Sequence, residues 1–125
     1  MISKTTEYKI ATTYDEYVGC HDLMKKDEEL SYPTVMAVRD GKAIGMIGTA
    51  RGKENLFATP IIANSIFTCI GLYELYERTL SNLGTKHYLF SVERKNIKLI
   101  NAVERLFEIK PFMKTDEQLF YARRI

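Results

Sequence analysis

The chain has 125 residues, a length that suits a single core, and we predict one domain over residues 1–125. Its 18 basic and 16 acidic side chains leave a formal charge of +2, which gives no electrostatic reason to expect nucleic acid or a membrane surface as a partner. The sequence shows no signal core and no apolar run near the roughly 20 residues of a membrane helix. We therefore expect a soluble, cytoplasmic protein.

The cysteines and histidines do not form a metal-binding pattern. Cys20 and Cys69 fall on separate predicted helices, and the sequence contains no Cys-x-x-Cys pair. His21 and His87 are not spaced as metal ligands. We expect no metal, and two free, buried thiols in a reducing compartment.

The first part of the chain predicts a strand followed by a capped helix. Residues 7–12 form the strand, and Thr13 and Glu16 fit a capping box, in which the hydroxyl accepts from one backbone amide and the carboxylate reaches back to another. The helix should fray in the charged run 25–29. Its expected buried stripe consists of Tyr14, Val18, His21 and Met24.

Residues 35–48 predict one β-hairpin, which the Tyr32–Pro33 pair separates from the preceding helix. Asp40-Gly41 supplies the left-handed backbone that a tight hairpin turn requires. An antiparallel strand that is apolar on both faces is typical of a central strand covered by helices. The two apolar faces of the first strand consist of Met36 with Val38 and of Val35 with Ala37.

The remainder alternates between strand and helix patterns, with Gly84 as a helix stop. Pro60 limits one strand, and residues 61–64 either extend it after a bulge or form a loop. The predicted elements are strands at 56–59 and 87–93, helices at 65–83 and 96–106, and two last strands near 107–113 and 118–122. The full order is therefore β-α-β-β-β-α-β-α-β-β.

This order resembles the GNAT superfamily of acyl-coenzyme A-dependent N-acetyltransferases. Residues 37–48 are similar to the second and third strands of that fold, and the chain from Tyr88 onward is similar to its fifth strand, fourth helix and last strands. The resemblance implies an α+β fold, a GNAT-like α/β/α arrangement around a central mixed, mostly antiparallel, splayed β-sheet. It also implies acetyl-coenzyme A as the acyl donor.

The short length and the tail Leu119-Phe120-Tyr121 are also similar to small GNAT-like proteins of tailed phages, including an internal virion protein of T7-like podophages. This closer resemblance implies a location in the host cytoplasm or in the virion. The acceptor is expected to be an amine on a small molecule or a protein. Monomer and homodimer both remain open.

The family's glycine-rich pyrophosphate loop, between its fourth strand and the next helix, is degenerate here. Its glycines let backbone amides approach the pyrophosphate, and the helix N-terminus adds a positive dipole. Two registers remain open. Residues 68–73 keep the first glycine as Gly71 but place Tyr73 where a tiny residue is expected, whereas residues 64–69 keep neither glycine.

No lysine or arginine lies at this helix start, so we expect capture by bare amides and weaker binding than in the family. The strand ending at Thr59 is expected to offer backbone groups to the pantetheine arm. The residues expected to bind coenzyme A are Thr59, Ser65, Ile66, Phe67 and Asn96.

The family's general-acid tyrosine aligns with Phe107 or Val103, neither of which carries a hydroxyl. Glu93, at the end of the predicted fifth strand, is the candidate catalytic base. Ser91 is a candidate catalytic donor to the thiolate. The alternatives are a surface carboxylate beside Lys95 and a strand hydroxyl with a structural partner.

Three further side chains are weaker candidates. His21 is either a base at neutral pH or a half-buried side chain packed among Tyr17 and Met24. Tyr73 and Tyr76 either reach a cleft or belong to the core, as helical spacing favours.

We predict an acyl-coenzyme A-dependent N-acetyltransferase of unknown amine substrate. The alternative is a catalytically inactive GNAT-fold protein of a phage virion or a host-interaction protein, which the missing glycines and tyrosine favour. A small α/β binding module unrelated to the family is a third hypothesis.

Overall fold

The computed structural model describes residues 5–24 and 29–125. This part of the chain forms the predicted order of elements. The strands are β1 (Glu7–Ile10), β2 (Ser31–Arg39), β3 (Lys42–Arg51), β4 (Leu56–Ala63), β5 (His87–Glu93), β6 (Met113–Lys114) and β7 (Gln118–Arg124), and the helices are α1 (Tyr14–Leu23), α2 (Ile66–Asn82) and α3 (Ile97–Phe107). Within the described ranges, no helix is long and apolar enough to span a membrane.

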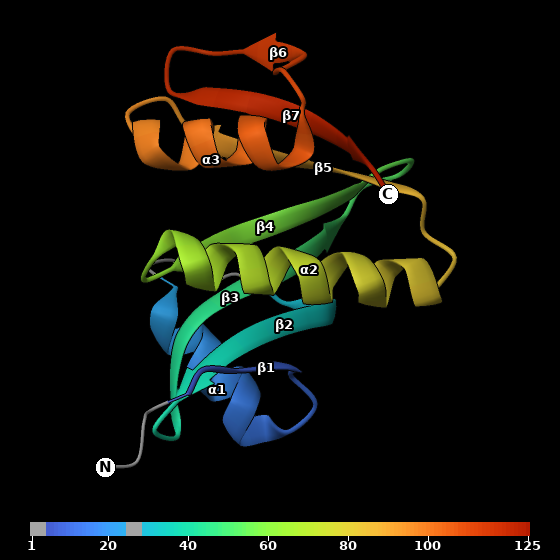
Figure 1. Cartoon of the computed structure of the whole chain (residues 1–125). Helices are drawn as coiled ribbons and strands as arrows, with labels where there is room; N and C mark the ends of the chain where they lie inside the picture. Colours follow the sequence, from blue (N-terminus) through green and yellow to red (C-terminus); the bar gives the residue numbers. More distant parts are fainter. Residues whose placement is uncertain (1–4, 25–28) are drawn as a thin grey trace.

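The strands form one mixed sheet in the order β1-β2-β3-β4-β5-β7-β6, which confirms the predicted fold class. Helix α2 lies across β2 to β4, α3 lies over β5 and β7 on the same face, and α1 packs on the opposite face against β3 (Figure 1). The two apolar faces of β2 follow from this layering. Val35 and Ala37 pack into the core under α2, whereas Met36 and Val38 pack with residues of α1.

The turn and cap predictions are confirmed in detail. Asp40 and Gly41 have φ angles of 54° and 73°, the left-handed conformation of a tight hairpin turn. The Thr13 hydroxyl accepts from the Glu16 amide at 3.2 Å, and the Glu16 carboxylate accepts from the Thr13 amide at 3.1 Å. Gly84, with a φ of 81°, follows the end of α2.

The sheet divides between β4 and β5. These parallel strands share a single paired position, Phe57 with Leu89, and then spread apart toward the starts of α2 and α3 (Figure 1). The register between β3 and β4 shifts at the same level, because Gly48 faces both Thr59 and Pro60. A Cβ on Gly48 would lie 2.7 Å from the Thr59 carbonyl oxygen, so this close approach requires glycine. The bulge bends β4 where the division begins.

Residues 61–63 continue β4 beyond this bulge, which settles the choice that the sequence left open between strand and loop. The expected break at Tyr32–Pro33 is wrong, because β2 begins at Ser31 and passes through both residues.

The expected buried stripe of α1 is wrong. Tyr14 is 82% exposed, and Val18 and His21 are also exposed. The helix instead turns Cys20 inward, into a cluster with Met36 and Met46 against which Tyr17 and Leu23 pack. The charged run 25–29 lies outside the described residues, apart from Glu29, which is exposed.

The predicted strand at 107–113 is also wrong. Phe107 ends α3, and β6 is confined to two residues, Met113 and Lys114. The helix continues for one more residue because the Phe107 ring packs against Tyr73 and Phe90 in the core.

Candidate functional site

Two helices begin beside the same cavity. The cavity has a volume of about 680 Å³ and lies where β4 and β5 have separated. Its lining includes the end of β4, the start of α2 and the start of α3. It brings together four of the five residues predicted to bind coenzyme A: Ser65, Ile66, Phe67 and Asn96.

Both helix starts are capped by side chains. The Ser65 hydroxyl accepts from the Thr68 amide at 3.2 Å, and the Asn96 side-chain oxygen accepts from the Leu99 amide at 3.3 Å. The amides of Ile66 and Phe67 belong to the first turn of α2, where an amide has no acceptor within its own helix. Two positive helix ends therefore meet at one cavity, an arrangement that favours a bound anion.

A basic residue that the sequence analysis did not single out, Lys98, also lies at this cavity. It lies in the first turn of α3 and lines the cavity together with Ser65 and Phe67 of the α2 start. Lys98 and Ser65 are far apart in sequence, so their proximity at the cavity is revealed only by the packing of α3 beside α2. The start of α2 itself carries no lysine or arginine, as the sequence indicated, and the basic residue at the cavity comes from α3.

The structure places one of the two candidate pyrophosphate segments at the junction between β4 and α2. Residues 64 and 65 connect β4 to α2, so the segment 64–69 occupies the strand-to-helix junction, while 68–73 lies within the helix. Gly71 has a packing role. A Cβ at this position would lie 2.3 Å from Cζ of Tyr8, a residue of β1.

Thr59 and Ser91 lie at a second, smaller cavity, rather than at the first one. This cavity has a volume of about 210 Å³ and lies at the same division of the sheet. Both residues are exposed. Each lies two residues along its strand from Phe57 or Leu89, so all four side chains point to the same face of the sheet, the one that α2 and α3 leave uncovered. Its lining combines these two hydroxyls with apolar residues: Ala50, Phe57, Ala58, Phe90 and Phe120.

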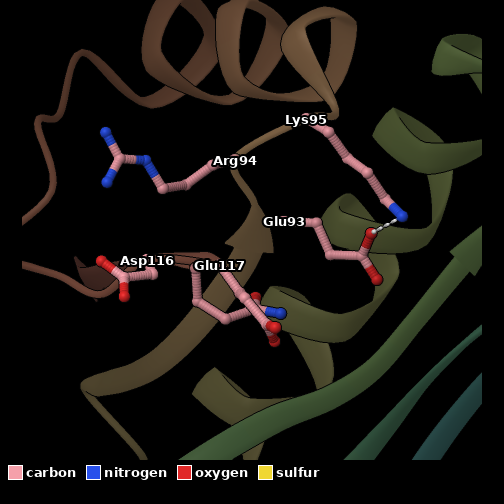
Figure 2. A pocket seen from close by; sticks show the side chains of 6 residues that line it. Glu93, Arg94, Lys95, Asp116 and Glu117 are labelled. Atoms are coloured by element: carbon pink, nitrogen blue, oxygen red, sulfur yellow. Dashed lines mark ion pairs between the residues drawn. The ribbon is translucent and has the colours of Figure 1, made fainter.

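Glu93 lines neither of these two cavities. It ends β5 and lines a third cavity, of about 320 Å³, with Asp116 and Glu117, the loop residues before β7. Its carboxylate lies 3.5 Å from the Lys95 ammonium, and Figure 2 shows these two groups turned toward each other, while Arg94 points away from them. The Glu93 side chain is 56% exposed, so the pair is solvated.

The remaining histidine and cysteine candidates are accounted for by their burial. His21 is exposed on α1, which excludes the expected packing among Tyr17 and Met24. Cys20 and Cys69 are free and buried, as predicted. Burial raises the pKa of Cys69 to about 11, so its thiol is protonated at neutral pH.

Comparison with known proteins shows a likeness in structure alone. No family model matches the sequence, and no curated protein matches it. The acetyltransferase from Streptococcus agalactiae 2603 is similar in structure, with a TM-score of 0.71 and 12% sequence identity. The alignment covers 96% of this chain and 98% of that one. The Escherichia coli ribosomal-protein-S18-alanine N-acetyltransferase covers 97% and 94% with a TM-score of 0.69, also at 12% identity.

The chain has the GNAT acetyltransferase fold. A third similar structure is the diaminobutyrate acetyltransferase EctA from Paenibacillus lautus, in complex with its substrate and coenzyme A. It has 14% identity and a TM-score of 0.66, and the alignment covers 97% of this chain and 96% of that one. The likeness extends over nearly the whole length, so the predicted GNAT architecture is confirmed.

Proposed function

We propose that this chain binds acetyl-coenzyme A and transfers its acetyl group to an amine. The observation that carries the proposal is the meeting of two helix starts and Lys98 at one cavity beside the divided sheet. Solved structures with this fold include one that holds coenzyme A, the EctA complex. Acetyl-coenzyme A supplies an activated thioester, so positioning provides much of the rate.

The residues at the cavity fit the charge and shape of such a donor. The first-turn amides of Ile66 and Phe67, together with Lys98, would hold the pyrophosphate. The free edge of β4 from Thr59 onward would run beside the pantetheine arm, because β5 no longer pairs with it there. Loss of the family glycines is compatible with this role, since the helix-start amides need no side chain to bind an anion.

The smaller cavity would take the amine. Thr59 and Ser91 line it from the two separated strands, and the face of the sheet there is uncovered. Glu93 lies two residues beyond Ser91 in β5, so the two side chains point to the same face of the sheet. We propose that Glu93 accepts the proton of the incoming ammonium from the solvent side. Ser91 would donate a hydrogen bond to the departing thiolate.

A matched pair of variants tests the pyrophosphate site. Proline is tolerated at the first position of a helix, and Ser65 before it is already extended, with φ −158° and ψ 165°. Ile66→Pro therefore removes one amide donor and keeps the helix, whereas Ile66→Ala shortens the side chain and keeps the donor. Calorimetric titration with coenzyme A should show roughly tenfold weaker binding for Ile66→Pro than for Ile66→Ala.

Lys98→Ala should weaken coenzyme A binding as well, and the loss should shrink as salt is raised. Wild-type protein that shows no binding at millimolar coenzyme A would overturn the proposed function. Equal affinities of the two Ile66 variants would remove the α2 start from the site.

The catalytic assignment needs a separate assay with a panel of amines. Glu93→Gln should lower acetyl transfer by roughly 100-fold and leave coenzyme A affinity unchanged, while Lys95→Ala should retain transfer. Unchanged transfer in Glu93→Gln would return this carboxylate to an ordinary surface pair. Binding of coenzyme A without transfer to any amine would favour the alternative of a GNAT-fold protein that works by binding.

A further inference from the structure

One face of the sheet is left open over β4, β5 and β7. Helices α2 and α3 cover the opposite face, and α1 packs against β3, beside the half of the sheet that β1, β2 and β3 form (Figure 1). Because side chains alternate along a strand, the pairing of the strands identifies the ones that point to the open face. They are Phe57 and Thr59 of β4, Leu89, Ser91 and Glu93 of β5, and Gln118 and Phe120 of β7.

The open face changes from apolar to polar along β5. Ser91 is paired with Phe120 of β7, and Glu93 lies two residues farther along β5. The Phe57 and Phe120 side chains are half-buried, so part of each ring remains in contact with water. The Glu93 carboxylate forms a solvated pair with the exposed Lys95, which an incoming ammonium can replace. The face therefore offers an apolar surface next to a negative charge.

The smaller cavity on this face has room for about one ring. Its volume is about 210 Å³, whereas an engineered apolar cavity of about 150 Å³ binds benzene. Phe57 and Phe120 both line it. Among the described residues, no charged side chain lines it, and the hydroxyls of Thr59 and Ser91 are its polar side-chain groups. This composition suits an apolar group with a polar group at one end.

We propose that the acceptor is a small primary amine carried on one apolar ring. This inference rests on the proposed function. The ring of the acceptor would cover Phe57 and Phe120, and its ammonium would lie toward Ser91 and Glu93. In the transfer, the amine nitrogen bonds to the acetyl carbon, and the carbon–sulfur bond breaks with its electron pair left on sulfur. Glu93 takes the first proton of the ammonium and passes it to solvent, and the second proton ends on sulfur.

Other classes of amine fit the same cavity less well. A polyamine carries further ammonium groups, and the described part of the chain places no carboxylate in the cavity lining to pair with them. The N-terminus of a peptide has a polar amide next to its amine, and burying that amide against an apolar lining without a hydrogen bond is unfavourable. These two classes therefore serve as comparisons.

The test measures acetyl transfer to matched amines. 2-Phenylethylamine and ethylamine differ in the ring that would enter the cavity. Burial of a ring of this size predicts that the kcat/KM of wild type is roughly 10- to 100-fold higher for 2-phenylethylamine than for ethylamine. Spermidine and a short alanine peptide should be no better than ethylamine.

Two substitutions change the cavity in opposite directions. Phe120→Ala removes one of its apolar side chains, and Ala50→Leu fills space beside Phe57, with which Ala50 is paired. Each should lower the preference for 2-phenylethylamine over ethylamine by roughly tenfold, and Ala50→Leu should retain transfer to ethylamine. Phe112→Ala should keep the wild-type preference, because Phe112 is 57% exposed and lies outside this cavity. If Phe120→Ala does not fold, Ala50→Leu decides the question.

The same preference in Ala50→Leu and wild type would overturn the inference, and so would faster transfer to spermidine or to the peptide. Both results would leave an acetyltransferase in place. If coenzyme A binds but no amine is acetylated, amide chemical-shift mapping with 2-phenylethylamine decides. Changes centred on Phe57, Ser91 and Phe120 would support the inference, and their absence would overturn it. Absence of coenzyme A binding to wild type would overturn the proposed function and this inference with it.

Discussion

Phe57 of β4 and Leu89 of β5 form the one pair that joins these two parallel strands in the described structure. Beyond that pair, β4 bends at the Thr59–Pro60 bulge and β5 continues toward the start of α3. The backbone groups of β4 beyond the pair therefore face a space that another extended chain can fill. The positive ends of α2 and α3 lie beside the same space.

The Gly71→Ala variant distinguishes a packing role of this glycine from a role in phosphate binding. The added Cβ would lie 2.3 Å from the Tyr8 ring, so α2 or the ring must shift. We expect a loss of about 1–2 kcal/mol in the free energy of unfolding, because the overlap outweighs the better helix propensity of alanine. Chemical denaturation measures this loss.

A Tyr8→Ala background should reverse the sign of the Gly71→Ala effect, since the overlapping ring is gone. Coenzyme A affinity should be unchanged throughout. If Gly71→Ala instead abolished coenzyme A binding at full stability, the phosphate loop would lie at residues 68–73.

Glu77 connects α2 to the C-terminal strands. Its carboxylate accepts from Arg123 Nε at 2.7 Å, from Arg123 Nη2 at 3.0 Å and from the Tyr88 hydroxyl at 2.7 Å. Glu77→Ala leaves a largely buried guanidinium and a buried phenol without this partner, so we expect unfolding free energy to fall by about 2–4 kcal/mol. Glu74→Ala, at an exposed position of the same helix, should change it by less than about 0.5 kcal/mol. Equal effects of the two variants in urea titrations would contradict this.

The capping box of α1 predicts an acid-sensitive contribution to stability. A hydrogen bond from Lys9, with further bonds from the backbone of Thr12 and Thr13, lowers the pKa of Glu16 from 4.5 to about 2. Because the folded state favours the charged carboxylate, its contribution is complete above pH 4.5 and is lost as the pH falls toward 2.

Glu16→Gln keeps an acceptor for the cap but removes the charge. The stability difference between wild type and this variant should be at most about 1 kcal/mol at pH 6, and should vanish near pH 2. Thermal unfolding between pH 2 and 6 measures it, and a difference that does not change with pH would rule out the carboxylate as its source.

The two thiols should be slow to react in the folded protein. Burial raises the pKa of both Cys20 and Cys69 to about 11, from an ordinary value of 9.0, and the nearby Glu16 adds to the shift at Cys20. The thiolate fraction at pH 8 is then roughly 100-fold below that of an unperturbed thiol. At pH 8, neither thiol should be alkylated until the chain is unfolded. Fast modification of Cys69, seen in a Cys20→Ser variant, would show that the larger cavity exposes its sulfur.

Local sequence patterns correctly predicted the features whose conformation depends least on tertiary contacts. The Asp40-Gly41 turn, the Thr13–Glu16 cap and the alternation of Tyr88, Phe90 and Val92 all depend on residues close in sequence, and the structure confirms them. The stripe of α1 failed because its polar and apolar residues do not separate clearly. Tertiary packing of Cys20 in a cluster with Met36 and Met46 decides which side is buried.

The candidate site was predictable only in part, for the same reason. Ser65, Ile66 and Asn96 were found because helix starts have a local signature. Lys98 was not placed, because its position at the cavity arises from the packing of α3 against α2. No pattern within either helix indicates that the two helix starts share one cavity.

Amide chemical-shift mapping with coenzyme A tests the central claim most directly. The largest changes should fall on residues 61–67, 96, 98 and 99, which line the cavity between the two helix starts. Another basic depression, lined by Arg51, Lys53 and Lys86, serves as an internal comparison and should show small changes. Changes that centre on that depression, or that spread over the surface without a centre, would contradict a coenzyme site at the divided sheet.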